Sequence, residues 1–241
     1  MNIFEASGLG KRYGGTWALR ECTLEIPAGH VAALIGPNGA GKTTLLNLAV
    51  GLVQPSAGGV TVLGGRPAGS PAALDGIAFV AQDTPLYKNL SVADMIYVTR
   101  ALNRRFDQPY ALARLAELGI PPRRKAGKLS GGQQAQLALT LALARRPRLL
   151  VLDEPVAMLD PIARHDFMAT VLAAAQDGVS VLLSSHVLTE LERVASYLVL
   201  LSRARVLLAG PVRDLLATHR QDSLEALALT CLRENTAEVA R

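Results

Sequence analysis

Short apolar runs alternate along the chain with turn-rich and helix-like segments. The N-terminal third contains four apolar runs of strand length, separated by turns rich in Gly and Pro. A segment with helical spacing lies between the second and third runs and stops at Gly51, a residue common at helix ends. We therefore expect strands over 23–26, 31–35, 60–63 and 77–81 and a helix over 43–50.

The pattern changes to helices in the middle of the chain. Ser91, with Asp94 three residues later, resembles a capping box that opens a helix over 92–102. Two more helices are expected over 110–118 and 133–144. Together these segments predict a helical region that follows the N-terminal strands.

A strand–helix alternation follows the helical region. The apolar run 149–152 is typical of a buried parallel strand, and a helix after Pro161 and the run 179–184 continue the alternation. This order predicts a parallel sheet flanked by helices. The remaining elements expected are a late strand pair over 197–201 and 205–209 and a helix over 222–233, with Leu224, Leu227 and Leu232 on one face.

Length and hydropathy limit the class of protein. The 241 residues suit one large domain, or one domain with an inserted subdomain. Half of the residues are hydrophobic, but the longest apolar runs are far shorter than the ~20 residues of a membrane-spanning helix. No secretory leader is visible, so a membrane part would have to come from another chain. Cys22 and Cys231 are expected to be reduced thiols.

The chain carries a net charge of +5, which raises the question of a nucleic-acid partner. Its basic residues are scattered along the sequence, and only 4% of residues are aromatic, which leaves little for base stacking. We therefore expect no nucleic-acid partner and interpret the charge as a solvated surface that faces anionic lipid. The basic residues lie over 104–105, 123–128 and 145–148 and at Arg203 and Arg205.

Two segments carry the chemistry of a nucleotide site. The first has two glycines, a lysine and a threonine at the spacing of a phosphate-binding loop, in which backbone N–H groups surround phosphate oxygens, the lysine reaches the outer phosphates and the threonine hydroxyl binds Mg²⁺. A structural glycine turn is the alternative, but the strand before it and the helix after it favour nucleotide binding. The segment is Gly36-Pro37-Asn38-Gly39-Ala40-Gly41-Lys42-Thr43.

The second segment is the apolar run that ends in Asp153 and Glu154. Two carboxylates at the end of a buried strand are costly unless they bind a cation or a water. Asp153 fits a contact to Mg²⁺ through water, and Glu154 fits polarisation of the attacking water in phosphoryl transfer. Strands that end in acidic residues are common, but one that follows a phosphate-binding loop in the sequence indicates a nucleotide site.

The signature Leu129-Ser130-Gly131-Gly132-Gln133 lies between these two segments, and with it the chain resembles the ATP-binding-cassette (ABC) ATPases over residues 3–211. Gln82 resembles the glutamine loop of that family, Asp160 its aspartate loop and His186 its switch histidine. Tyr13 lies where the family places an aromatic ring under the adenine, although it could instead be a packing aromatic beside Trp17.

The resemblance implies the fold and the ligands. It implies an α/β P-loop NTPase of RecA-like type, with a parallel core sheet and an N-terminal antiparallel β-subdomain. A helical subdomain over about 84–145 is inserted in this ATPase domain. The domain spans residues 1–220 and is followed by a helical tail over 221–241. ATP and Mg²⁺ are the implied cofactors. The implied metal ligands are Thr43, Gln82 and Asp153, and Glu154, His186 and Gln82 are the implied catalytic residues. The implied nucleotide-binding residues are Tyr13, residues 36–43 named above, Thr44, Ser130, Gly131, Gly132, Gln133 and Asp160.

The resemblance also implies partners. Two subunits of this family face head to tail, so that each ATP lies between the phosphate loop of one subunit and the signature of the other. We expect a second copy of the chain, or a related subunit, and a transmembrane permease that docks on the segment after Gln82, at Thr84, Pro85, Leu86, Tyr87 and Lys88 and over 90–92. Export, as in bacterial multidrug, antibiotic or peptide exporters, at the cytoplasmic face of the plasma membrane is the preferred interpretation.

Two alternative functions are open, and the sequence differs from the family at two positions. An importer motor is one alternative, and a soluble ABC ATPase that acts on ribosomes or DNA is another; the absence of a second cassette, a long coiled coil or zinc-binding cysteines disfavours the latter. Ala157 lacks a hydroxyl that would bond across the dimer in much of the family. Gln136 replaces a residue that is commonly basic in the signature helix. Neither change removes a catalytic group.

Overall fold

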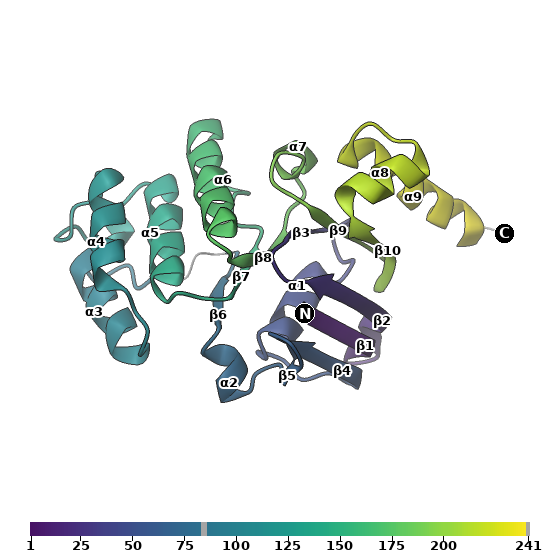
Figure 1. Ribbon diagram of the computed structural model, residues 1–241, viewed down its shortest axis with the longest axis horizontal. Coiled ribbons are helices and arrows are strands. Elements are labelled where there is room, and N and C mark those ends of the chain that lie inside the picture. The colour runs from purple at the N-terminus through teal and green to yellow at the C-terminus, as the bar shows by residue number, and fades with distance from the viewer. Residues whose placement is uncertain (83–85, 240–241) are drawn as a thin grey trace.

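The computed structural model describes residues 1–82 and 86–239 and has two sheets and several helices (Figure 1). In the described residues one sheet is antiparallel, with strand order β2-β1-β4-β5. The bulges at its β1–β2 pair twist the two long strands. The strands are β1 Asn2–Tyr13, β2 Thr16–Pro27, β4 Ala57–Val62 and β5 Arg66–Pro67.

The second sheet forms the centre of the molecule. Its strand order is β10-β9-β3-β8-β7-β6, and every pairing is parallel except that of the edge strand β10 with β9. The mixed α/β fold with a parallel core sheet and an antiparallel N-terminal sheet is therefore confirmed. The strands are β3 Val31–Ile35, β6 Ile77–Val80, β7 Leu149–Asp153, β8 Ser180–Ser184, β9 Tyr197–Ser202 and β10 Arg205–Pro211.

Several of the helices lie toward the two ends of the molecule. Helices α3, α4 and α5 lie side by side at the end of the molecule far from the antiparallel sheet, α6 stands next to α5, and α8 and α9 lie near the other end (Figure 1). None of the helices in the described ranges has both the length and the apolar character needed to cross a bilayer. The helices are α1 Lys42–Ala49, α2 Pro71–Leu74, α3 Val92–Leu102, α4 Gln108–Glu117, η1 Ala126–Lys128, α5 Gly131–Ala144, α6 Pro161–Gln176, α7 Leu188–Leu191, α8 Val212–His219 and α9 Leu224–Val239.

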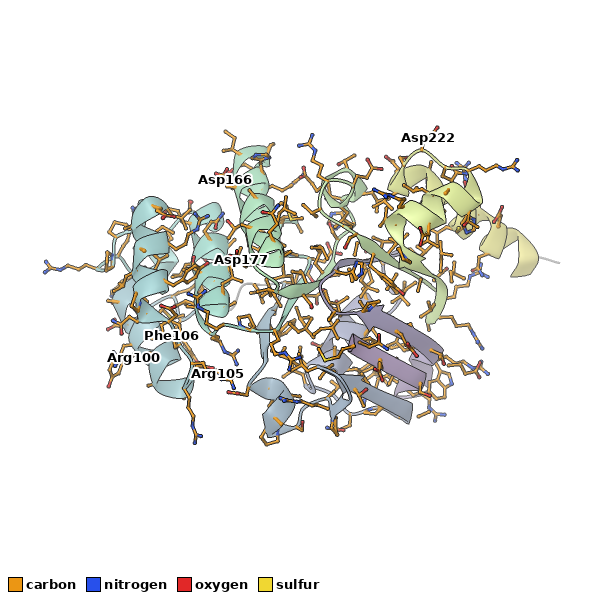
Figure 2. All side chains as sticks on the ribbon, in the orientation of Figure 1. Arg100, Arg105, Phe106, Asp166, Asp177 and Asp222 are labelled. Carbon is orange, nitrogen blue, oxygen red and sulfur yellow. The ribbon has the colours of Figure 1, made fainter. Side chains whose placement is uncertain are left out.

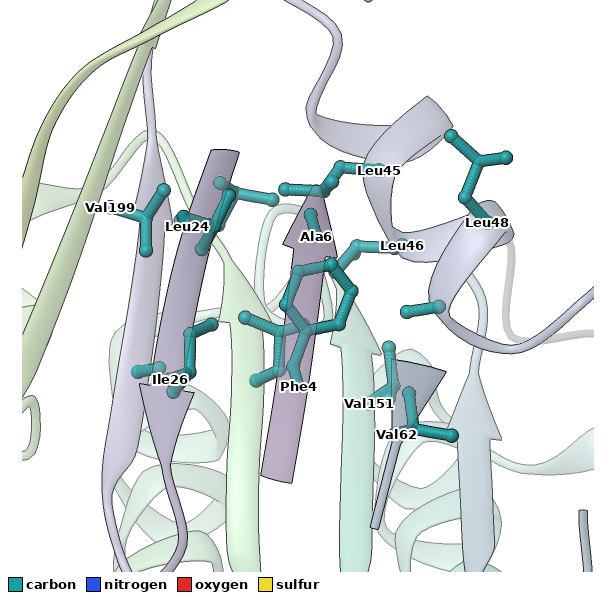
Figure 3. Close-up of a cluster of buried hydrophobic side chains, with 14 of the residues drawn as sticks. Phe4, Ala6, Leu24, Ile26, Leu45, Leu46, Leu48, Val62, Val151 and Val199 are labelled. Atoms are coloured by element: carbon teal, nitrogen blue, oxygen red, sulfur yellow. The ribbon is translucent and has the colours of Figure 1, made fainter. Parts of the chain in front are cut away.

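Alternating side chains of the central strands divide the core. On β7, Val151 packs with Phe4, Leu46 and Val62 in a cluster that joins the two sheets and α1 (Figure 3), whereas Leu152 faces the cluster beneath α5 and α6. A third cluster lies between α3, α4 and α5. The phosphate-loop helix α1 is thereby fixed between the antiparallel sheet and the central sheet.

Several predicted boundaries differ from the structure. Strand β6 ends at Val80, so Gln82 lies in the turn beyond the strand and does not end it. The long strand β1 was not predicted, because Gly8 and Gly10 and its bulges interrupt its alternation. The predicted capping box of α3 is confirmed, with Ser91 and Asp94 bonded reciprocally. Thr84 and Pro85 lie outside the described residues.

Candidate functional site

The phosphate-binding segment connects the end of β3 to α1, where it forms a tight loop. Two of its glycines have backbone conformations and surroundings that exclude a side chain. A Cβ on Gly36, with φ of 150°, would lie 2.2 Å from the Leu201 carbonyl oxygen, and one on Gly41, with φ of 107°, would lie 2.5 Å from the Ala18 carbonyl oxygen. Glycine is therefore required at both positions by strain and by space.

Lys42 begins α1 and is buried, with 7% of its surface exposed. Its Nζ donates hydrogen bonds to the carbonyl oxygens of Gly36, at 2.8 Å, and Pro37, at 3.3 Å. The same Nζ lies 3.9 Å from Oε1 of Glu154. The loop thus holds an ammonium group beside a carboxylate, at the N-terminus of a helix whose first N–H groups are free for an anion.

Asp153 and Glu154 stand at the end of β7, as predicted. Asp153 is buried, and its Oδ1 accepts a hydrogen bond of 2.7 Å from the Ser184 hydroxyl. The same hydroxyl oxygen accepts a hydrogen bond of 2.9 Å from the backbone N–H of Glu154. Ser184 therefore fixes both acidic residues, a role that the sequence did not indicate because this serine ends an apolar strand, opposite Asp153 in the register.

Glu154 has a left-handed backbone conformation, with φ of 48°, which is uncommon for a residue other than glycine. Such strain persists only where the surrounding structure enforces it, and it occurs often at functional sites. The side chain is mostly buried, and its second oxygen, Oε2, is hydrogen-bonded to Nδ1 of His186. His186 follows the end of β8, so β7 and β8 bring a carboxylate and an imidazole together beside Lys42.

A cavity of about 310 Å³ joins these groups to more of the predicted residues. Tyr13, at the end of β1, contributes a ring that is nearly half exposed and lies 5.1 Å from the Lys11 ammonium group. Ala18, which the sequence did not indicate, also contributes to the wall. The lining residues are Tyr13, Ala18, Asn38, Gly39, Gly41, Lys42, Thr43, Thr44, Gln82 and Glu154.

The chemistry of this lining suits a nucleotide with a hard cation. Thr43 and Gln82 place a hydroxyl and an amide group around the same cavity as Lys42, and oxygen ligands are those that Mg²⁺ prefers. Asp153 does not line the cavity and lies directly before Glu154, which agrees with a contact through water. No cluster of three His, Cys, Asp or Glu side chains suited to a metal occurs among the described residues.

The signature residues lie elsewhere. Ser130 caps α5, and its side chain and that of Gln133 form a capping box. Gly131 and Gly132 form the first turn, and a Cβ on Gly132 would lie 2.8 Å from that of Ala163 on α6. Gly132 therefore allows the N-terminal ends of α5 and α6 to pack closely.

A second cavity, of about 310 Å³, lies at this junction, and it shares no lining residue with the phosphate-loop cavity. Asp160 caps α6 by accepting hydrogen bonds from the N–H groups of Ile162 and Ala163. Within the described part of one chain, Ser130, Gly132, Gln133 and Asp160 therefore come together, but they do not complete the phosphate-loop site.

One of the two sequence departures, Gln136, lies at this second cavity. Gln136 lines it and is buried, and neither polar atom of its side chain has a hydrogen-bond partner among the described residues. Ala157 stands next to Met158, whose side chain is 93% exposed. An exposed apolar side chain therefore stands two residues before Asp160 in the sequence.

Comparisons with known proteins agree with this geometry. A family model described as "ABC transporter" matches residues 19–157. The chain is 33% identical over 207 residues to the lantibiotic transport ATP-binding protein SrtF of Streptococcus pyogenes, covering 86% of this chain and 90% of that protein. It is 36% identical over 224 residues to the Fe(3+) ions import ATP-binding protein FbpC 2 of Rhodococcus jostii, covering 89% of this chain and 64% of that protein.

A solved ATP-binding subunit of an ABC transporter has the same fold, with a TM-score of 0.82 and 27% identity, over 95% of this chain and 99% of that one. The predicted P-loop NTPase fold is thus confirmed. The family model covers more than half of the chain, and the matched region includes the phosphate-binding loop, the signature and both acidic residues of β7. The chain therefore belongs to the ABC transporter family, as an ATP-binding subunit that hydrolyses ATP to drive transport.

Proposed function

We propose that this ATPase binds ATP with Mg²⁺ between two copies of itself and drives outward transport through a separate membrane permease, at the cytoplasmic face of a bacterial plasma membrane. The observation that carries the nucleotide part is the arrangement of Lys42, Glu154 and Tyr13 around one cavity. This arrangement offers a cation for phosphate, a base for water and a ring for adenine.

In this proposal the residues around the cavity divide the work of binding and hydrolysis. Lys42 leaves its backbone acceptors for the outer phosphates, while the N–H groups of residues 39–43 surround the remaining oxygens. Thr43 and Gln82 hold Mg²⁺, with Asp153 acting through water, and the cation neutralises phosphate charge when bound. Glu154 accepts a proton from the attacking water, and His186 orients Glu154 and contacts the γ-phosphate.

The separation of the two cavities supports a shared site. Among the described residues, the signature and the phosphate loop line two different cavities, so the signature is free to cover the nucleotide of a second copy. Ser130, Gly131 and Gly132 lie at the N-terminus of α5, which suits an anion such as the γ-phosphate. Gln133 and Asp160 would complete the contact, and Met158 would lie at the same interface.

Size-exclusion chromatography with ATP and Mg²⁺ tests the shared site. Glu154→Gln should bind ATP but hydrolyse it slowly, so a dimer should accumulate. Adding Ser130→Arg should abolish that dimer, while ATP binding to the monomer survives because the phosphate loop is unchanged. A Glu154→Gln protein that binds ATP and stays monomeric at high concentration, or a double variant that still dimerises, contradicts the shared site.

A groove on the side of the molecule formed by α3, α4 and α5, which we call the helical side, supports docking of a permease. Its volume is about 180 Å³, and Leu86, from the segment after Gln82, lines it together with residues of β6, α3 and α5. Tyr87 beside it is 67% exposed. Such a groove suits a short apolar helix of another chain. The lining residues are Phe79, Val80, Leu86, Thr99, Ala138, Leu141, Ala142 and Arg145.

Extraction of membranes with mild detergent tests the docking. The protein should copurify with a polytopic membrane protein, and Leu86→Glu should prevent this because it places a charge in the apolar groove. Leu112→Glu is the matched control, because Leu112 is an exposed leucine of α4 outside the groove. Both variants should retain ATP affinity. Equal copurification of both variants would refute this docking site.

The direction of transport rests on similarity. A relative named for lantibiotic transport matches over 90% of its own length, which supports the exporter interpretation, and relatives named for Fe(3+) import make import the alternative. Once the permease is copurified, reconstitution into vesicles with ATP on the side of this subunit distinguishes the two. Export requires that substrate leaves that side, and accumulation there instead would establish import.

A further inference from the structure

Charge is distributed very unevenly over the fold. Residues 86–148, which contain α3, α4 and α5, carry 12 Lys and Arg against 3 Asp and Glu, whereas the remaining chain carries 13 against 17. The helical side is therefore strongly cationic, although the chain as a whole is only moderately basic. Neither the hydrolysis of ATP nor the groove described above requires this excess.

Many of these cations have no partner among the residues that the structure describes. One group, which we call the cationic loop, comprises Lys88, Arg123, Arg124, Lys125 and Lys128, and all of its members are exposed. No hydrogen bond, ion pair or ring contact of the described residues involves the side chain of any of them or of Arg104.

Backbone hydrogen bonds hold the cationic loop in place. The N–H of Val92 at the start of α3 donates to the Arg124 carbonyl oxygen at 2.9 Å, and the N–H of Gly127 donates to the Lys88 carbonyl oxygen at 3.0 Å. A Cβ on Gly127 would lie 2.9 Å from the Lys88 Cβ, so the segments around these two residues are in close contact. The five cations are therefore presented together at one end of α3.

A second cationic group lies at the other end of the same helix. Arg100, Arg104 and Arg105 cluster at the C-terminal end of α3, and Figure 2 shows Arg100 and Arg105 at the lower end of the helical side. Arg100 hydrogen-bonds to Gln108, and Arg105 pairs with Asp75, so Arg104 is the free cation of this group within the described residues. A helix of this length separates the groups by about 16 Å.

Exposed apolar and aromatic side chains lie between and beside the two groups. Tyr97 on α3 is 73% exposed, and Leu102 at its end is 78% exposed. Tyr87 stands next to Lys88. Tyrosine rings and aliphatic side chains among Lys and Arg are typical of protein surfaces that lie in the headgroup region of a bilayer.

We propose that this surface, formed by the cationic loop, α3 and Arg104, binds anionic phospholipid headgroups directly. The cations would contact phosphate groups, and Tyr97 and Leu102 would enter the headgroup layer. A leucine contributes nothing to recognition of a nucleic-acid backbone, and the exposed aromatic rings are few, so a lipid surface fits better than a polynucleotide. This binding requires neither nucleotide nor permease.

Vesicle sedimentation with the purified full chain tests the proposal. The parent should bind vesicles of equal parts phosphatidylglycerol and phosphatidylcholine and should not bind vesicles of phosphatidylcholine alone. Each cation near an anionic bilayer contributes about fivefold in affinity. The triple variant Arg123→Gln/Arg124→Gln/Lys125→Gln should therefore bind at least about tenfold more weakly. Raising NaCl from about 0.1 M to about 1 M, which shortens the Debye length from about 10 Å to about 3 Å, should release the parent.

A control variant separates the surface from the net charge. Arg203→Gln/Arg213→Gln/Arg233→Gln removes the same charge from three exposed arginines outside the helical side. It should bind the anionic vesicles as the parent does. ATP affinity should be unchanged in both triple variants, which shows that they are folded.

Fluorescence quenching tests whether Tyr97 on α3 enters the headgroup layer. A tryptophan introduced by Tyr97→Trp should be quenched by brominated phosphatidylglycerol, whereas Trp17 of the parent, on β2, should not. The proposal is overturned if the parent does not bind anionic vesicles at low salt, if the two triple variants lose equal affinity, or if the introduced tryptophan is not quenched. Binding of a DNA duplex without binding to the vesicles would also overturn it.

Discussion

Replacement of Glu154 by glutamine tests the chemistry of the phosphate-loop cavity most directly. Glutamine keeps the length and shape of the side chain and removes its negative charge and its ability to take a proton. In the structure this carboxylate lies 3.9 Å from the Lys42 ammonium group and is hydrogen-bonded to His186. The substitution therefore changes one charge within an otherwise intact cavity.

The expected effect is large for hydrolysis and small for folding. Loss of a positioned general base lowers a rate by about 10²- to 10⁴-fold, and a hundredfold loss corresponds to about 2.7 kcal/mol in the activation barrier. Lys42 keeps its two backbone acceptors, Gly36 and Pro37, so it is not left buried without partners. The midpoint of thermal unfolding should therefore shift by only a few degrees.

The assay is phosphate release at saturating ATP and Mg²⁺, together with nucleotide affinity from equilibrium titration. ATP affinity should stay the same or increase, because a carboxylate near the γ-phosphate repels it. Glu225→Gln, an exposed glutamate on α9, is the matched control and should hydrolyse ATP as the parent does. Hydrolysis by Glu154→Gln within tenfold of the parent would refute the role of Glu154 as base.

Four further outcomes are expected. Lys42→Ala should weaken ATP binding at least tenfold in equilibrium titration, since a lost charge-assisted hydrogen bond costs about 1.5–3 kcal/mol; unchanged affinity would refute the loop assignment. Gly36→Ala should likewise weaken ATP binding, because its Cβ would displace a neighbouring carbonyl and distort the loop. Tyr13→Ala should weaken ATP and GTP equally, by about 1 kcal/mol or more, because stacking uses the face of a base; a loss confined to ATP would mean that the ring instead reads adenine. Iodoacetamide should label Cys231 well before Cys22 in peptide mass spectrometry, because Cys22 is fully buried and Cys231 only partly, so access favours Cys231 although burial raises the pKa of both thiols; early labelling of Cys22 would contradict its burial.

The parts of the site that are contiguous in sequence could be predicted. Residues 36–43 carry glycines, a lysine and a threonine at a recognisable spacing, and Asp153 with Glu154 follows the apolar run 149–152. The capping box at Ser91 and Asp94 was predicted in the same way. The residue types and their spacing are local in each case and so can be seen in the sequence, whereas the contacts of Gly36 with Leu201 and of Gly41 with Ala18 come from the fold.

The parts that depend on strand order could not be derived from spacing. Ser184 and Asp153 are opposite each other only because β7 and β8 are adjacent and parallel, and nothing in the sequence near either residue indicates that pairing. The contact of His186 with Glu154 has the same origin, and the sequence suggested it only through family resemblance. The strand β1, which carries Tyr13 to the cavity, escaped detection because its bulges break the alternation of polar and apolar residues.

The cationic surface could not be predicted from the sequence either. Basic residues over 104–105 and 123–128 are separated along the sequence, and the net charge of +5 gives no sign that they lie at the two ends of one helix. They are exposed there because α3, α4 and α5 pack around their own apolar cluster, which leaves the connecting loops on the surface. The rest of the chain is acidic and partly cancels them in the total. A charge that is averaged over a whole chain therefore understates the field at one side of it, and the side that is cationic here is also the side that carries the proposed permease groove.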